Sequence, residues 1–139
     1  MAKVDVIRLP DWHERLIHFV NGRRLMPYAY GTNDCWTFTQ AAILEMTGTE
    51  LFPEIKPNHW LSAAKVLIRN GWDSVEELIS DPLGPPSEPI DTRPGDVVSF
   101  ESCDSYHLAV RIGDSAVTPF DTGTMVIKST QWRRSWKVG

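Results

Sequence analysis

The sequence predicts an α+β domain in which N-terminal helices pack on a C-terminal antiparallel β-sheet. Apolar residues recur at helical spacing in the first half of the chain, whereas after Pro94 they follow β-strand patterns. Between the two halves, residues 82–94 hold five of the ten prolines, so an extended connection without a helix or inner strand is expected. Helices followed by strands are typical of an α+β arrangement, here expected as a single domain over residues 1–139.

Three of the four expected helices are marked by patterns near their ends. Asp11 and Glu14 match a capping box ahead of an apolar stripe, which predicts a helix over about residues 12–23. A third helix fits about residues 59–70, where a glycine follows. The Asp-Ser-Val-Glu run at 73–76 matches a second capping box and predicts a short fourth helix.

The second expected helix is the most apolar of the four, and it begins with a cysteine. Either Asn33 or Asp34 caps it, and it runs from Cys35 to Met46. Gly48 ends it, as a C-cap glycine does. Because its apolar stripe is wide, we expect this helix to be central and buried.

The second half of the chain is predicted to form the sheet. Strands are expected at residues 97–100, 108–112, 116–120 and 124–129, and a last one within 132–138. The second and third of these strands form a hairpin around Gly113-Asp114.

The composition excludes several classes of protein. Fourteen basic and eighteen acidic residues give a net charge of −4, which argues against a nucleic-acid partner. No window approaches the roughly 20 apolar residues that a membrane span needs, so no membrane insertion is expected. The N-terminus lacks the apolar segment of a secretory signal, which predicts synthesis and folding in the cytoplasm. Two cysteines are too few for a disulfide scaffold or a cysteine-rich zinc site, and we expect neither a metal nor a cofactor.

Cys35 and His107 are the candidate catalytic pair. A helix N-terminus lowers a thiol's pKa through its dipole and free N–H groups, and the same N–H groups can stabilise an oxyanion. The alternative for Cys35 is a buried structural cysteine. His107 follows a polar loop expected at residues 101–106 and begins a strand, so it can supply the imidazole from a separate element.

Three segments carry a family resemblance. Residues 27–35 (Pro-Tyr-Ala-Tyr-Gly-Thr-Asn-Asp-Cys) resemble the motif that opens the catalytic domain of the NlpC/P60 family. Residues 93–100 (Arg-Pro-Gly-Asp-Val-Val-Ser-Phe) are similar to the Pro-Gly-Asp strand of that family, and residues 107–113 to its His strand. The three motifs occur in the family's order and span about residues 27–120.

The resemblance implies a papain-like fold and hydrolysis of peptide bonds in bacterial cell-wall stem peptides. It implies that Cys35 is the nucleophile and His107 the base and later acid. Asp34 would line the substrate groove, and Tyr28 would donate a hydrogen bond to the oxyanion or the substrate. A packed loop aromatic is the alternative for Tyr28.

The chain departs from the family at two positions. The family usually has Ser-Gly after Asp-Cys, but here Trp36 takes the place of the serine, which leaves substrate preference open. This indole would point either into the core or toward the groove. Twelve positions after His107 the family often has a polar residue, and here it is Pro119. Thr118, Asp121 or a backbone carbonyl could replace it, and Thr118 is preferred because the hairpin register places it on the face of His107.

Short chains that carry these motifs and no secretory signal resemble the NlpC/P60-like proteins of phage and prophage tails. The resemblance implies a wall hydrolase carried by a virion tail, with peptidoglycan stem peptides as substrate and other tail proteins as partners. Two alternatives stay open. One is a structural tail component that has lost catalysis, and the other is a thiol amidase or acyltransferase with a different substrate.

Overall fold

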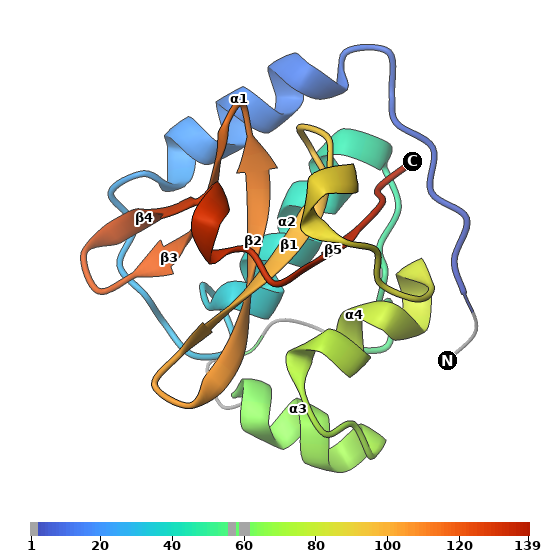
Figure 1. The fold of residues 1–139 in the computed structure, drawn as a ribbon, viewed down its shortest axis with the longest axis vertical. Helices are drawn as coiled ribbons and strands as arrows, with labels where there is room; N and C mark the ends of the chain where they lie inside the picture. The colour runs from blue at the N-terminus through green and yellow to red at the C-terminus, as the bar shows by residue number, and fades with distance from the viewer. Residues whose placement is uncertain (1–2, 56–57, 59–61) are drawn as a thin grey trace.

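A computed structural model describes residues 3–55, 58 and 62–139. Helices lie around an antiparallel sheet, as Figure 1 shows, so the predicted α+β class is confirmed. The four α-helices are α1 (Trp12–Arg23), α2 (Cys35–Thr47), α3 (Ala63–Asn70) and α4 (Val75–Leu83). Helix α2 packs on β2 and β3, α1 covers α2, and α4 contacts β2 and β5.

The sheet has five strands in the order β4-β3-β2-β1-β5, and every adjacent pair is antiparallel. The strands are β1 (Val97–Ser102), β2 (Ser105–Ile112), β3 (Ser115–Phe120), β4 (Gly123–Lys128) and β5 (Arg134–Trp136). Two short 3₁₀ turns, η1 (Pro89–Asp91) and η2 (Ser129–Gln131), flank the sheet segments. The hairpin expected around Gly113-Asp114 is confirmed, since Ile112 pairs with Ser115.

The predicted polar loop at residues 101–106 is wrong. Strands β1 and β2 continue through it and meet in a two-residue turn, in which Ser102 pairs with Ser105. The turn residues Cys103 and Asp104 both have positive φ, 52° and 61°, as a type I′ turn requires. Cysteine seldom adopts this conformation, so the residue types did not indicate a tight turn.

The helix boundaries follow the sequence closely at some ends and not at others. Gly48 ends α2 in the left-handed conformation, as expected. Pro82 lies inside the last turn of α4, and η1 is a 3₁₀ helix at Pro89–Asp91, so the expectation that no helix enters residues 82–94 is wrong at both places. Helix α3 begins at Ala63, capped by Ser62, and the part of its predicted range at 59–61 lies outside the described residues. The cap of α4 is Ser74, one position after the first residue of the predicted capping box. Its side chain accepts a hydrogen bond from the N–H of Glu77.

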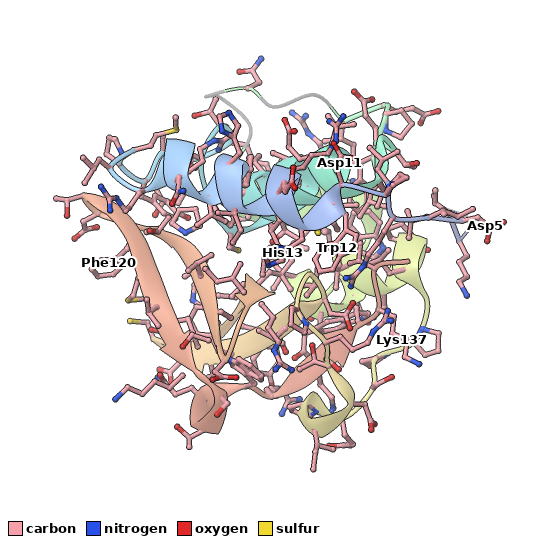
Figure 2. The ribbon with its side chains drawn as sticks, turned by 90° about the horizontal axis from the view of Figure 1, so that it is seen from above. Asp5, Asp11, Trp12, His13, Phe120 and Lys137 are labelled. Carbon is pink, nitrogen blue, oxygen red and sulfur yellow. The ribbon has the colours of Figure 1, made fainter. Side chains whose placement is uncertain are left out.

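The N-termini of α1 and α2 differ although both have an aspartate at the cap. Asp34 is fully buried, and its carboxylate accepts hydrogen bonds from the N–H of Gly31 (2.8 Å) and from the N–H (3.0 Å) and hydroxyl (2.8 Å) of Thr37. Asp11 makes no cap hydrogen bond and instead pairs with Arg15 in solvent, on the side of α1 that faces away from the sheet (Figure 2). The capping box predicted for α1 is therefore wrong, and the one that forms belongs to α2.

A second buried carboxylate ties the N-terminal segment to the sheet. Asp96 is fully buried and accepts hydrogen bonds from the guanidinium of Arg8 (2.8 Å) and the N–H groups of Arg93 and Val138. Arg8 also donates to the carbonyls of Pro94 and Val138. Gly95 has a φ of +91°, and a Cβ there would lie 2.9 Å from the Arg8 guanidinium. The Pro-Gly-Asp motif thus serves packing around Arg8.

Replacing Asp34 with alanine should destabilise the protein strongly. The change leaves buried donors of Gly31 and Thr37 without an acceptor and removes a helix cap, which together cost about 2 kcal/mol or more of unfolding free energy. Urea unfolding followed by circular dichroism measures this change. Asp11→Ala is the matched control because its carboxylate caps nothing, and its midpoint should stay close to that of the wild type. Equal losses in the two variants would contradict this account of the cap.

Candidate active site

A cavity of about 290 Å³ opens where two strands of the sheet separate. Strands β2 and β3 are paired from Ile112↔Ser115 only as far as Val110↔Val117, whereas β3 stays paired with β4 out to Phe120↔Gly123. Past Val117, β3 therefore follows β4 and leaves β2. The cavity lies in this gap, between loop residues 28–30, the start of α2, the β1–β2 hairpin and the ends of β3 and β4.

Cys35 lines this cavity from the first position of α2, with 6% of its surface exposed. Burial raises the pKa of its thiol to about 12, because an unpaired thiolate loses its hydration there. The backbone N–H of Leu108 acts in the opposite direction, and so do the N–H groups of Cys35 and Trp36 at the helix start. The charge of Asp34 adds to the rise. The thiol by itself is therefore protonated at neutral pH.

His107 lines the same cavity from the third position of β2. Its Nε2 lies 3.2 Å from the carbonyl oxygen of Ser102 and 3.3 Å from the hydroxyl of Ser105. Its ring stacks on Phe100 at 5.4 Å between centroids and 27° between planes. No hydrogen bond joins the ring to the Cys35 sulfur among the described residues, although such bonds often tighten only when substrate binds.

Tyr28 lies on the opposite wall from the sheet and is half-buried. Burial raises the pKa of its phenol, and nearby negative charge on Cys35 or Asp34 raises it further. The phenol is therefore a hydrogen-bond donor throughout the working pH range of a hydrolase. The ring meets that of Tyr30 edge to face at 5.1 Å, and the Tyr28 N–H donates to the carbonyl of Phe120.

Thr118 lines the cavity from β3, but its hydroxyl has another partner. The Oγ1 atom donates to the carbonyl of Leu108 at 2.9 Å. The β2–β3 pairing stops at Val117, so the expected cross-strand pairing of Thr118 with position 109 does not occur. Pro119 and the exposed Asp121 also line the cavity.

Two of the residues expected to bind substrate lie outside the cavity lining. Asp34 is fully buried, and its carboxylate is engaged by Gly31 and Thr37. Trp36 points into the core with 1% of its surface exposed, which is the inward of the two orientations considered for it. Its indole N–H has no hydrogen-bond partner in the described part of the chain. The structure therefore brings Cys35, His107, Thr118 and Tyr28 together around one cavity. Asp34 and Trp36 lie in the interior and do not line it.

Sequence reasoning missed the hairpin residues around His107. Phe100, Ser102 and Ser105 all contact its ring, yet the polar run at 101–106 indicated a loop. A signal was available in the spacing, because Phe100 and His107 are paired once the turn is limited to two residues. Within residues 3–55, 58 and 62–139 no cluster of three or more His, Cys, Asp or Glu side chains could hold a metal ion. Nor does this part of the chain contain a helix long and apolar enough to span a membrane.

The arrangement of helices and sheet is similar to that of a solved structure. A crystal structure described as similar to a lipoprotein of the NLP/P60 family, from Staphylococcus aureus subsp. aureus Mu50, superposes with a TM-score of 0.55 at 12% sequence identity. The match covers 99% of this chain and 45% of that chain, so the present chain spans less than half of that protein. The likeness concerns the fold.

The sequence places the chain more narrowly. Residues 7–138 match the model of a family described as a domain of unknown function, DUF6950, and the chain belongs to this family. No curated protein matches the sequence.

The raised thiol pKa predicts an unusual order of alkylation. At pH 8, iodoacetamide should modify the exposed Cys103 before the buried Cys35, because alkylation requires an accessible thiolate. The rate at Cys35 should keep rising as the pH increases beyond 9, since the thiol is half deprotonated only near its pKa of about 12. Peptide mapping by mass spectrometry at several pH values measures both rates. Faster alkylation of Cys35 than of Cys103 at pH 8 would contradict the raised pKa of the Cys35 thiol.

Proposed function

We propose that the protein is a cysteine hydrolase that cleaves amide or peptide bonds in the stem peptides of bacterial peptidoglycan. The observation that supports this proposal most strongly is that Cys35, at a helix N-terminus, and His107, on a neighbouring strand, line one cavity. The NlpC/P60-like fold and the three sequence motifs support the same assignment. The helix-on-sheet placement of the pair is that expected of a papain-like enzyme.

The proposed reaction has two steps. The Cys35 proton moves to His107 as the sulfur attacks the scissile carbonyl carbon, and the negative charge passes to the carbonyl oxygen. The Cys35 N–H and the Tyr28 hydroxyl stabilise this oxyanion. His107 then gives its proton to the leaving amine, and Cys35 is left as a thioester. In the second step His107 removes a proton from a water molecule, which attacks the thioester and releases the acid and the Cys35 thiol.

The buried thiol becomes a nucleophile through its partner rather than alone. A lone thiolate is unfavourable in this cavity, as the pKa of about 12 indicates. An imidazolium beside it compensates the lost hydration, so thiolate and imidazolium form together as an ion pair. We infer that substrate binding brings the hairpin that carries His107 closer to Cys35, so that the ring and the sulfur come into hydrogen-bond contact while the ring keeps its contacts within the hairpin.

We further propose that the protein acts as part of a phage or prophage tail. The resemblance of the sequence to tail-associated NlpC/P60-like chains supports this setting, in which synthesis is cytoplasmic and the virion delivers the enzyme to the wall. Other tail proteins would then be its partners.

A structural tail component that has lost catalysis is the alternative that one observation favours. Cys35 is almost completely buried and has no hydrogen bond to His107 in the described residues. A thiol acyltransferase or an amidase with another substrate would use the same pair. Mass spectrometry of reaction products distinguishes hydrolysis from acyl transfer.

Loss of either catalytic side chain should abolish turnover. Cys35→Ser and His107→Ala should each reduce peptidoglycan hydrolysis by at least about a thousandfold, and the double variant should be no worse, because the two groups act as a unit. Zymography and the release of soluble wall fragments measure the activity, and thermal unfolding checks the fold. Cys103→Ser is the matched thiol control. A Cys35→Ser variant that keeps substantial activity would remove Cys35 from the mechanism.

The enzyme should prefer intact wall to short free peptides. Asp34 is engaged within the fold and cannot hold a free amine. The cavity wall includes the aromatic rings of Tyr28, Tyr30, Phe100 and Phe120, which offer contact area to an extended wall peptide. We therefore expect faster turnover of whole sacculi than of a free tripeptide, measured as product per enzyme per minute. Faster cleavage of the tripeptide would refute this preference. Cleavage of neither substrate by reduced protein would favour the structural component.

A further inference from the structure

We propose that the β1–β2 hairpin orients His107, with the Ser102 carbonyl and the Ser105 hydroxyl fixing its Nε2 and the Phe100 ring fixing its plane. This inference rests on the proposed hydrolase function. It names the groups that orient His107 in place of the polar side chain that the family often has at the position of Pro119. The positioning residues come from the two strands joined by the Cys103-Asp104 turn.

The contacts at Nε2 define the tautomer of the ring. A carbonyl oxygen can only accept a hydrogen bond, so Nε2 at 3.2 Å from the Ser102 oxygen must carry the proton. The Ser105 hydroxyl can accept from the same N–H at 3.3 Å while its own proton points to the Ser102 carbonyl at 3.4 Å. One proton on Nε2 serves both contacts of the ring, and the Ser105 hydroxyl proton serves the third, which leaves the lone pair on Nδ1.

The ring plane is set by the strand pairing. Phe100 is the partner of His107 in the β1–β2 register, and their rings stack at 27°. Ser105 is two residues before His107 on the same strand, so its side chain projects from the same face of the sheet. Because the plane and one nitrogen are both fixed, Nδ1 is the atom left to meet a thiol.

The tight turn holds the accepting carbonyl in place. Ser102 and Ser105 pair directly, and both residues between them have positive φ. A longer turn would not close the ladder at this pair, and the Ser102 carbonyl would move away from the ring.

The side chains of β3 are less suited to this role. The Thr118 hydroxyl donates to the Leu108 carbonyl at 2.9 Å, and within the described residues no hydrogen bond joins it to His107. Pro119 has no polar side chain. Asp121 lines the cavity but is exposed at the strand end, past Phe120, which lies at the outer margin of the molecule in Figure 2.

The proton accounting is consistent with the proposed reaction. Nδ1 takes the Cys35 proton as the carbon–sulfur bond forms, and the ring becomes an imidazolium that still donates from Nε2 to Ser102. Nδ1 then returns its proton to the leaving amine as the carbon–nitrogen bond breaks. Nε2 keeps its proton throughout, so the hairpin contacts need not change during a turnover.

The other titratable groups that line the cavity are Tyr28, Tyr30, Cys35, Cys103 and Asp121.

The tautomer can be measured without any substrate. Nitrogen-15 NMR of histidine-labelled protein at alkaline pH, where imidazoles are neutral, distinguishes a protonated Nε2 from a protonated Nδ1. The His107 signals are assigned by their loss in His107→Gln. We expect a protonated Nε2 for His107. A protonated Nδ1, or an even mixture of tautomers as in a free imidazole, would overturn the proposal whatever the catalytic activity is.

Variants of the hairpin test the positioning itself. Ser105→Ala should lower kcat about tenfold with KM unchanged and weaken the Nε2–H preference, and Ser105→Thr should restore both. Ser115→Ala is the matched control, because Ser115 is likewise the first residue of a strand after a two-residue turn but does not line the cavity. Inserting a glycine after Cys103 should cause a larger loss than Ser105→Ala while circular dichroism stays native-like.

The outcomes separate this inference from the proposed function. If Thr118→Val or Asp121→Asn shifts the tautomer and Ser105→Ala and the glycine insertion do not, the positioning group lies on β3 and the proposal is wrong. If wild-type protein shows a protonated Nε2 that the glycine insertion removes, but hydrolyses no wall substrate, the hairpin role stands and the hydrolase function fails.

Discussion

The carboxylate of Asp34 determines where the rest of the site can lie. It joins the loop at Gly31 to the first turn of α2, and it does so in the interior, away from solvent. Cys35 is the next residue, so its sulfur is fixed relative to both the loop that carries Tyr28 and the helix N–H groups. An Asp-Cys pair at this point is thus one structural unit, in which the first residue positions the second.

The second constraint is the early end of the β2–β3 pairing. If the two strands remained paired past Val117, the space now facing Cys35 would be closed by the sheet. Instead β3 turns with β4, and β2 keeps its remaining length paired only with β1. His107 lies on this part of β2, which explains why two of its ring contacts, Phe100 and Ser102, come from β1 and the third, Ser105, from β2 itself.

The sequence allowed the main elements to be predicted where local chemistry determines them. The start of α2 at Cys35 and its end at Gly48 follow from a capping side chain and a left-handed residue, both visible in the residue types. The cap of α1 could not be predicted, because Asp11 has the same side chain as Asp34 and only tertiary packing makes the difference. Likewise the inward direction of Trp36 depends on how α2 meets the sheet, and the Cys103-Asp104 turn lacks the glycine or asparagine that usually marks one.

The buried contact between Arg8 and Asp96 has a consequence for how relatives of this chain should be compared. Gly95 and Asp96 are required by the packing of Arg8 and Trp12, far from the cavity that holds Cys35. A relative without the thiol would therefore still need this segment in order to fold, and a comparison of sequences would group it with relatives that keep the thiol. The segment therefore reflects the requirements of the fold, whereas the proposed hydrolysis would depend on Cys35 and on Ser105 beside His107.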